Sequence, residues 1–276
     1  MDDTLARIAA ALERLAPPPP ASADPLVHPA YVWRERTLVA ARAFAPLPIE
    51  LLRGVDAQKA LLHDNLTRLA AGHAAQDVLM WGARGTGKSA LVKASVAAIQ
   101  AEGGAIALVE VAADRLDTLP ELFGMIAGLP RAFVLFLDDL GIDVTADART
   151  LRSLLQGGAE ERPANARLVV TSNRRHLIPR DIHEQENAIN PRDSIDDHLA
   201  LADRFGLSIG FHVVDQEHYL AIVRGYAERY GLPFDPAEAV QWATRRGSRS
   251  GRVAWQYVTD LAGRAGKAMQ IGKSEP

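Results

Sequence analysis

A glycine-rich loop near residue 80 joins an apolar run to a helical pattern, and it leaves few folds open to the chain. Residues 78–81 predict a buried strand, and residues 90–99 have the periodicity of a helix. Between them lies Gly-Ala-Arg-Gly-Thr-Gly-Lys-Ser, residues 82–89. A strand, a loop of the pattern GxxxxGK[ST] and a helix form a phosphate-binding loop, or P-loop. The alternative is an ordinary glycine-rich turn before a helix, but the full spacing and both flanks favour the P-loop.

Each part of this loop has an expected task. Gly85 and Gly87 let the backbone curl so that successive N–H groups point at phosphate oxygens, and the next helix adds its positive N-terminal end. Lys88 would reach the β and γ phosphates, and Ser89 would offer its hydroxyl to Mg²⁺. We therefore expect bound ATP with Mg²⁺. The expected nucleotide-binding residues are Gly82, Ala83, Arg84, Gly85, Thr86, Gly87, Lys88 and Ser89.

A second apolar run ends in two carboxylates. Residues 133–137 predict a strand buried on both faces, and Asp138 and Asp139 follow at its carboxyl end, where ligands bind in parallel sheets. Asp138 is suited to hold Mg²⁺ through a water, and Asp139 to orient or deprotonate the attacking water. A polar strand terminus that caps a turn is the alternative, and the P-loop about fifty residues earlier makes the metal site the preferred interpretation.

The pattern of the whole chain predicts an α/β fold followed by helices. Five short apolar runs separated by helical stretches are typical of a parallel sheet built from βαβ units. From residue 215 onward the pattern is helical, with a last helix around residues 253–261. The expected strands are residues 78–81, 106–111, 133–137, 168–171 and 207–213.

The N-terminal part is expected to be a helical appendage. Residues 4–15 have helical spacing and end at the prolines of residues 17–20, residues 30–44 are compatible with a helix, and residues 55–69 predict a longer one. We therefore divide the chain into three parts. They are residues 1–50, an N-terminal helical segment with a Pro-rich linker; residues 51–213, the nucleotide-binding α/β domain; and residues 214–276, an α-helical domain.

Composition excludes several classes of function. The 276 residues are 48% apolar and 24% charged, as in globular proteins, and the absence of cysteine excludes disulfides, thiolate catalysis and Cys-ligated zinc. The acidic start and the lack of an apolar run of ~18 residues favour a cytoplasmic protein without a membrane partner. The net charge of -3 gives no general attraction to nucleic acid, so such a partner would need a local basic patch.

In its P-loop and in the two carboxylates after residues 133–137, the chain resembles AAA+ ATPases, and the resemblance extends over residues 51–265. Within them it is similar to the bacterial replication-initiator and loader-like group, whose second motif also often reads Asp-Asp, and to an uncharacterised bacterial family of AAA+ ATP-binding proteins. This resemblance implies a P-loop NTPase sheet of five parallel strands in the order 5-1-4-3-2 and a C-terminal α-helical lid. It also implies a homo-oligomer in which neighbouring subunits share the ATP sites.

The resemblance also assigns two residues near the fourth and fifth strands. Asn173, after the strand of residues 168–171, matches the first sensor, which contacts the γ-phosphate or the lytic water; a helix or turn cap is the alternative. Arg204, in the box of residues 201–206, is similar to an arginine finger that acts in trans on the neighbouring subunit's ATP. A surface ion pair with Asp203 is the alternative for Arg204.

Two further sites follow from the same resemblance. Residues 247–255 look like the lid helix with the second sensor arginine, for which Arg252 fits best and Arg249 is the runner-up. A solvated basic helix start is the alternative, although positive charge there opposes the helix dipole unless an anion compensates it. Residues 54–56 lie where the family places its adenine-contacting backbone.

Other polar features receive no catalytic assignment. Glu110 is a carboxylate in the second expected strand, and a buried structural role suits it equally well. The long polar stretch between Asn173 and Asp203 suggests an element near a subunit interface, and its histidines His176 and His183 lack metal-like spacing.

These observations favour an ATPase whose nucleotide state drives oligomerisation and the remodelling or loading of an unidentified macromolecule. Many active family members have Glu where this chain has the shorter Asp139, so turnover is expected to be slow. A weakly hydrolysing adaptor or switch that binds ATP and ADP is the alternative. A P-loop kinase for a small metabolite is a third interpretation, which the Asn173 and Arg204 boxes disfavour.

Overall fold

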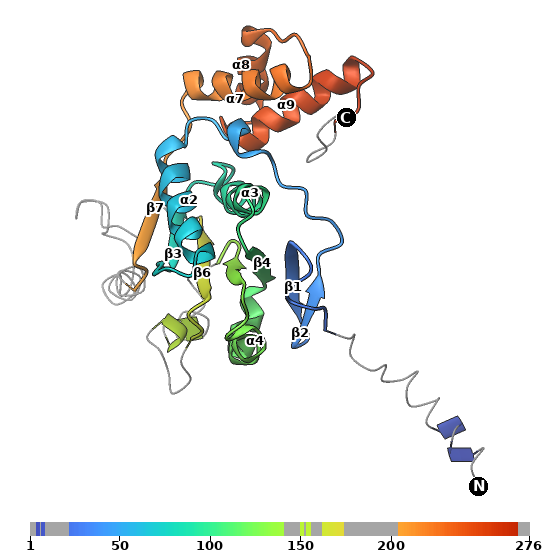
Figure 1. The fold of residues 1–276 in the computed structure, drawn as a ribbon. Helices are drawn as coiled ribbons and strands as arrows, with labels where there is room; N and C mark the ends of the chain where they lie inside the picture. Colours follow the sequence, from blue (N-terminus) through green and yellow to red (C-terminus); the bar gives the residue numbers. More distant parts are fainter. Residues whose placement is uncertain are drawn as a thin grey trace, which may run out of the picture.

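A mostly parallel sheet forms the centre of the computed structural model (Figure 1). The structure describes residues 4–5, 7–8, 22–140, 150–151, 153–155, 162–173 and 204–269. Within these residues, seven strands pair in the order β2-β1-β4-β5-β6-β3-β7, and only the β1–β2 pair is antiparallel. The strands are β1 (Ala30–Arg34), β2 (Thr37–Ala40), β3 (Val78–Gly82), β4 (Ile106–Val111), β5 (Ala132–Leu137), β6 (Ala166–Ser172) and β7 (Leu207–Phe211).

Each of the five apolar runs that predict a strand is a strand, but the predicted number of strands is wrong. The runs correspond to β3, β4, β5, β6 and β7, and these five lie in the spatial order β7-β3-β6-β5-β4. That arrangement is 5-1-4-3-2 when they are numbered along the chain. The two additional strands extend the sheet beyond β4, so the observed sheet has seven strands and not five.

Residues 30–40 are therefore a β-hairpin, and the prediction of a helix over residues 30–44 is wrong. Its aromatic residues Tyr31 and Trp33 are almost fully buried, and the Trp33 indole Nε1–H donates to Thr118 Oγ1 at 2.8 Å. The few apolar residues of this segment fit the period of a helix as well as that of a strand. The segment becomes a strand because β1 pairs with the edge of β4. This part of the N-terminal segment belongs to the sheet rather than to a helical appendage.

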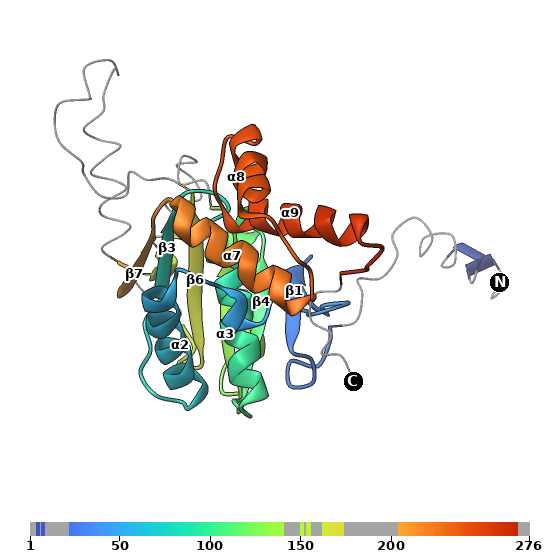
Figure 2. The ribbon, with the colours of Figure 1, turned by 90° about the horizontal axis from the view of Figure 1, so that it is seen from above.

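Helices cover both faces of the sheet. One apolar core lies under α2 (Asp56–Ala70) and α3 (Lys88–Ala101), which Figure 2 shows side by side. The opposite core contains α4 (Leu119–Ile126) and the short η2 helix (Ala113–Thr118). The sheet is thus shielded from water on both sides, as the continuous apolar strands predict.

The C-terminal helices form a bundle at the end of the sheet where α3 begins (Figure 1). They are α7 (Gln216–Arg229), α8 (Pro236–Arg245) and α9 (Gly251–Arg264), capped at their N-termini by the side chains of Asp215, Asp235 and Ser250. The bundle has its own apolar core, which Leu51 of the η1 turn (Ile49–Leu51) joins. In the part of the chain that is described, no helix combines the length and hydrophobicity needed to cross a bilayer.

Several predicted features fall outside the described residues. They include most of the helix expected at residues 4–15, the prolines at 17–20, His176, His183 and Asp203.

Candidate nucleotide-binding site

The loop after β3 has the backbone that a phosphate cradle needs. Gly85 has φ +78°, and a Cβ there would lie 3.0 Å from the Ser250 hydroxyl oxygen. Gly82 has φ +132°, and a Cβ on it would lie 2.1 Å from the carbonyl oxygen of Phe211 in β7. Both positions therefore require glycine for conformation and for space. The loop ends at Gly87, and α3 begins at Lys88, so the N-terminus of α3 faces the loop.

The Lys88 amine is buried and directed into the loop. Lys88 is only 5% exposed, and its Nζ donates to the carbonyl oxygens of Gly82 at 2.7 Å and Ala83 at 2.9 Å. It also donates to Asn173 Oδ1 at 3.1 Å, which links the loop to the end of β6. Burial lowers the pKa of Lys88, and the nearby Asp139 and Asp138 oppose that shift. A bound phosphate would supply the negative charge that this buried cation lacks.

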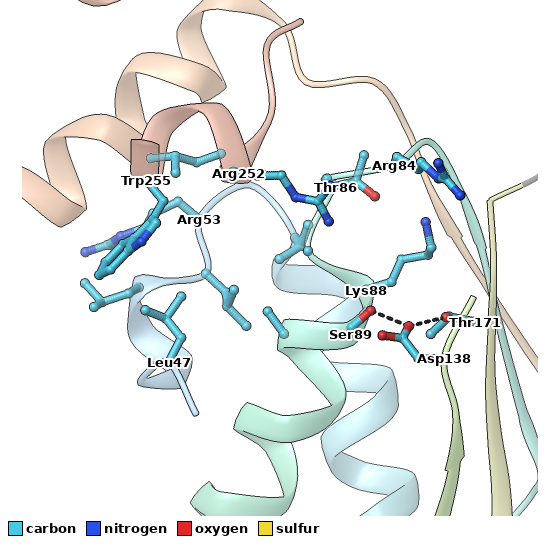
Figure 3. A pocket seen from close by; sticks show the side chains of 18 of the residues that line it. Leu47, Arg53, Arg84, Thr86, Lys88, Ser89, Asp138, Thr171, Arg252 and Trp255 are labelled. Carbon is cyan, nitrogen blue, oxygen red and sulfur yellow. Dashed lines mark hydrogen bonds between the residues drawn. The ribbon is translucent and has the colours of Figure 1, made fainter. Parts of the chain in front are cut away.

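Three oxygen-bearing side chains meet beside Lys88. The Ser89 hydroxyl donates to Asp138 Oδ1 at 2.6 Å, and the Thr171 hydroxyl donates to the same oxygen at 2.7 Å (Figure 3). A hydroxyl and a carboxylate are hard oxygen ligands, and Mg²⁺ uses only one or two protein carboxylates when phosphates and waters complete its shell. One Ser hydroxyl and one Asp carboxylate that share a hydrogen bond therefore fit a Mg²⁺ whose other ligands are phosphate oxygens and waters.

Asp139 has an unusual backbone conformation and a fully engaged side chain. Its φ is +54°, and its N–H donates to Thr171 Oγ1 at 2.8 Å. The carboxylate accepts from Asn173 Nδ2 through Oδ1 and from Arg84 through Oδ2 at 2.9 Å. The residues expected at the ends of the third and fourth strands thus lie together at the P-loop.

These groups line one cavity of about 550 Å³ between the sheet and the helical bundle. Figure 3 shows Lys88, Ser89 and Asp138 at one end and Leu47 with Trp255 at the other. The apolar end is built from the segment before α2, from α7 and from α9. Its lining residues are Leu47, Leu51, Leu52, Val55, Ile222, Tyr226 and Trp255, with Arg53 beside them.

Most of this apolar end was missed by sequence reasoning. Of the expected adenine-contacting residues 54–56, Val55 lines the cavity. Tyr226 and Trp255 pack edge to face with ring centroids 5.2 Å apart, and burial raises the pKa of Tyr226 to about 12, so this end carries an uncharged phenol. Apolar residues at helical spacing indicate only a buried face, and nothing in the sequence says that part of that face is left open to a ligand.

The start of α9 touches the P-loop directly. The Gly251 N–H donates to the Gly85 carbonyl oxygen at 3.1 Å, and the Ser250 side chain accepts from the Val253 N–H at 3.3 Å. Of the two arginines that the sequence offers as a second sensor, Arg252 in the first turn of α9 lines the cavity, and Arg249 does not. The role of Arg252 as a sensor stays a prediction.

Two other polar residues lie away from the cavity. Arg204 lies three residues before the start of β7 and does not line this cavity within its own chain. Glu110 pairs with Lys93 of α3 at 3.1 Å and also lies outside it. The structure gives Glu110 a surface ion pair, so the buried structural role that the sequence suggests for it is wrong.

The comparison with known proteins settles the family. A model described as "Protein of unknown function (DUF815)" matches residues 27–265. The chain belongs to this family. Its match covers the hairpin, the sheet and the helical bundle, so the DUF815 region includes every residue that lines the cavity. No match was found among curated proteins.

Two solved structures show a fold similar to that of this DUF815 chain. The RuvB Holliday junction branch migration motor of Thermotoga maritima is 16% identical, with a TM-score of 0.51 over 81% of this chain and 68% of that chain. The ORC1 protein of Aeropyrum pernix, in complex with DNA, is 14% identical, with a TM-score of 0.53 over 83% of this chain and 68% of that chain. At such identities the likeness concerns the fold alone.

Proposed function

We propose that this protein binds Mg·ATP in the cavity between its sheet and its helical bundle and hydrolyses it slowly. The observation that carries the proposal is the Ser89–Asp138 hydrogen bond of 2.6 Å, placed beside the buried Lys88 amine at the polar end of the cavity. Binding of Mg·ATP requires three groups: a cation that contacts the phosphates, a hydroxyl that binds the metal and a carboxylate that holds the metal. Ser89 would bind Mg²⁺ directly and Asp138 through a water.

The two ends of the cavity suit the two ends of ATP. Its volume of about 550 Å³ lies within the common range for small-molecule pockets. The triphosphate would lie against the P-loop, Lys88 and Arg252, and the adenine would lie between Val55 and Trp255. A base is flat and weakly polar, so aromatic and aliphatic walls suit it.

Hydrolysis would use the polar residues at the strand ends. A water oxygen bonds to the γ-phosphorus, the bond from that phosphorus to the β–γ bridging oxygen breaks, and the water proton passes to Asp139. Asn173 would orient the water, while Lys88 and Arg252 would compensate the charge that develops on the phosphate oxygens.

Assembly is the second part of the proposal. Arg204 lies outside its own chain's cavity, so a role in hydrolysis requires a neighbouring subunit that receives it. We infer a homo-oligomer that forms or tightens with ATP, in which residues 214–276 act as a lid on the α/β domain of residues 51–213. Such an assembly would remodel or load a macromolecule. The RuvB and ORC1 likenesses make DNA one target to test, although the net charge of -3 does not favour it.

Phosphate release and molecular mass test these two parts separately. We expect slow Mg²⁺-dependent phosphate release that Asp138→Asn lowers at least about a hundredfold, and a larger species in ATP than in ADP or without nucleotide. Arg204→Ala should lower turnover in the assembly and leave the ATP affinity of each subunit unchanged. A monomer at all nucleotide conditions would contradict the role of Arg204 in trans.

A nucleotide-controlled adaptor is the second candidate function. The hydrogen bonds from Asn173 and Arg84 hold the Asp139 carboxylate on protein partners, which favours binding over turnover. ATP-dependent assembly without measurable phosphate release would identify the adaptor.

A further inference from the structure

An ion pair joins the P-loop to the carboxylate proposed to accept the water proton. Arg84 is the third residue of the loop, and its guanidinium lies 2.9 Å from Asp139 Oδ2 at the end of β5. The loop positions between the first and last glycines vary freely in the P-loop pattern, so the pattern itself gives Arg84 no task. The pair is therefore a feature of this chain.

The backbone holds Asp139 in place for this contact. Its φ of +54° lies in the left-handed region, which is uncommon for a residue other than glycine. The hydrogen bond from its N–H to Thr171 Oγ1 helps to stabilise the conformation. Thr171 in turn donates to Asp138, so the directions of both carboxylates depend on one hydroxyl.

In this arrangement both oxygens of the Asp139 carboxylate accept hydrogen bonds from side chains of the protein. One oxygen accepts from Asn173 and the other from Arg84. Asn173 also accepts from Lys88, so Lys88, Asn173, Asp139 and Arg84 form a continuous chain of contacts along the polar end of the cavity. Each carboxylate oxygen can accept a second hydrogen bond, so a water can still reach Asp139, but the two contacts fix the direction in which the carboxylate points.

Arg84 is placed to exchange the carboxylate for a phosphate. It lines the cavity, and Figure 3 shows it at the end that holds Lys88 and Asp138, away from Trp255. Its side chain is 73% exposed and that of Asp139 is 50% exposed, so water screens the pair and it is easily exchanged. A phosphate offers a planar guanidinium two oxygens and more negative charge than one carboxylate does.

We propose that Arg84 is a positioning residue, which holds Asp139 until the terminal phosphate of a nucleoside triphosphate draws the guanidinium away. The proposal rests on the proposed ATP site. Triphosphate binding then frees Asp139 Oδ2 for the water, while a diphosphate leaves the ion pair intact. Because binding and release are coupled, removal of the carboxylate must strengthen triphosphate binding.

A double-mutant cycle on nucleotide affinity tests this coupling. The proteins are the full-length wild type, Arg84→Ala, Asp139→Asn and the double variant, and the ligands are a non-hydrolysable ATP analogue and ADP, each with Mg²⁺. We expect Asp139→Asn to raise the affinity for the ATP analogue in the wild-type background. In the Arg84→Ala background the same substitution should raise that affinity by a factor about two to five times smaller. For ADP the two factors should be equal.

The controls separate the ion pair from general electrostatics. Asp138→Asn removes a neighbouring carboxylate that bonds to Ser89 and Thr171, so its effect should be the same with and without Arg84. Arg84→Lys keeps the charge without the planar fork and should restore part of the coupling. Circular dichroism and thermal melts confirm that each variant is folded.

The outcomes are distinguishable. Equal Asp139→Asn factors in both backgrounds for the ATP analogue would overturn the inference and leave the proposed ATP site standing. Coupling of the same size for ADP would also overturn it, because the terminal phosphate would not be the competitor. If the folded wild-type chain bound neither nucleotide, the proposed function and the inference would both fall.

Discussion

The two ends of the cavity are built in different ways. The polar end comes from one continuous loop and from the ends of two neighbouring strands, so its residues are placed by the local backbone and by the sheet. The apolar end comes from the segment before α2, from α7 and from α9, which are far apart in the chain and meet only when the bundle packs on the sheet. The polar end should therefore determine whether a phosphate binds, and the apolar end which nucleotide is preferred and how the bundle responds.

The largest expected effect is at the polar end. Lys88→Ala removes the buried cation, and with hydrogen bonds to charged groups contributing about 1.5–3 kcal/mol each, the loss of two should weaken Mg·ATP at least about a hundredfold. Equilibrium binding by calorimetry measures it. The matched control is Lys93→Ala on the same helix, which breaks the pair with Glu110 outside the cavity and should leave the affinity unchanged. Unchanged affinity in a folded Lys88→Ala variant would refute the phosphate site.

The second largest effect is expected for Asp138→Asn, which should weaken Mg²⁺ binding more than phosphate binding. Metal stabilisation of the transferring phosphate contributes several kcal/mol, so turnover should fall at least about a hundredfold. The Mg²⁺ concentration for half-maximal turnover should rise in parallel. Phosphate release measured across a Mg²⁺ titration would contradict the assignment if the variant matched the wild type.

At the apolar end, Trp255→Ala should weaken ATP but not inorganic triphosphate. Loss of one base–aromatic contact costs about 1–3 kcal/mol, so we expect about tenfold or more for ATP. The comparison of the two ligands separates the ends of the cavity within one protein. Trp242→Ala is the control, because Trp242 packs on Tyr257 in the same bundle without lining the cavity. An equal loss of triphosphate binding would show that the ends are not independent.

The smallest expected effect concerns the contact between the P-loop and α9. Ser250→Ala removes the N-cap of α9 and should destabilise the protein by about 1 kcal/mol, and Asp235→Ala at the N-cap of α8 should do the same. Only Ser250 lies against Gly85, so only Ser250→Ala should also change ATP affinity. Thermal melts with and without ATP measure both quantities. If ATP raised the melting temperatures of the two variants equally, the contact between Ser250 and the P-loop would not couple ATP binding to the helical bundle.

The sequence predicts β3, β5 and the polar residues that follow them, because each depends on a local pattern. That these residues bind a phosphate and a metal stays a prediction, based on a glycine turn before a helix and a carboxylate after a buried strand. Sequence reasoning failed at residues 30–40, where the apolar residues fit either a helix or a strand and the open edge of β4 decides. It also missed the Arg84–Asp139 pair, since the two residues are 55 positions apart and the left-handed backbone of Asp139 has no sequence signal.

By itself the sequence determined the glycine-rich loop between a strand and a helix, the five runs that form parallel strands and the helical character of the C-terminal part, because each of these depends on spacing and hydrophobicity within about twenty residues. Only the tertiary structure decided that the hairpin extends the sheet, that Trp255 faces the same cavity as Lys88 and that α9 begins against Gly85. These relations depend on which distant surfaces can be buried together, and burial is a property of the folded chain as a whole.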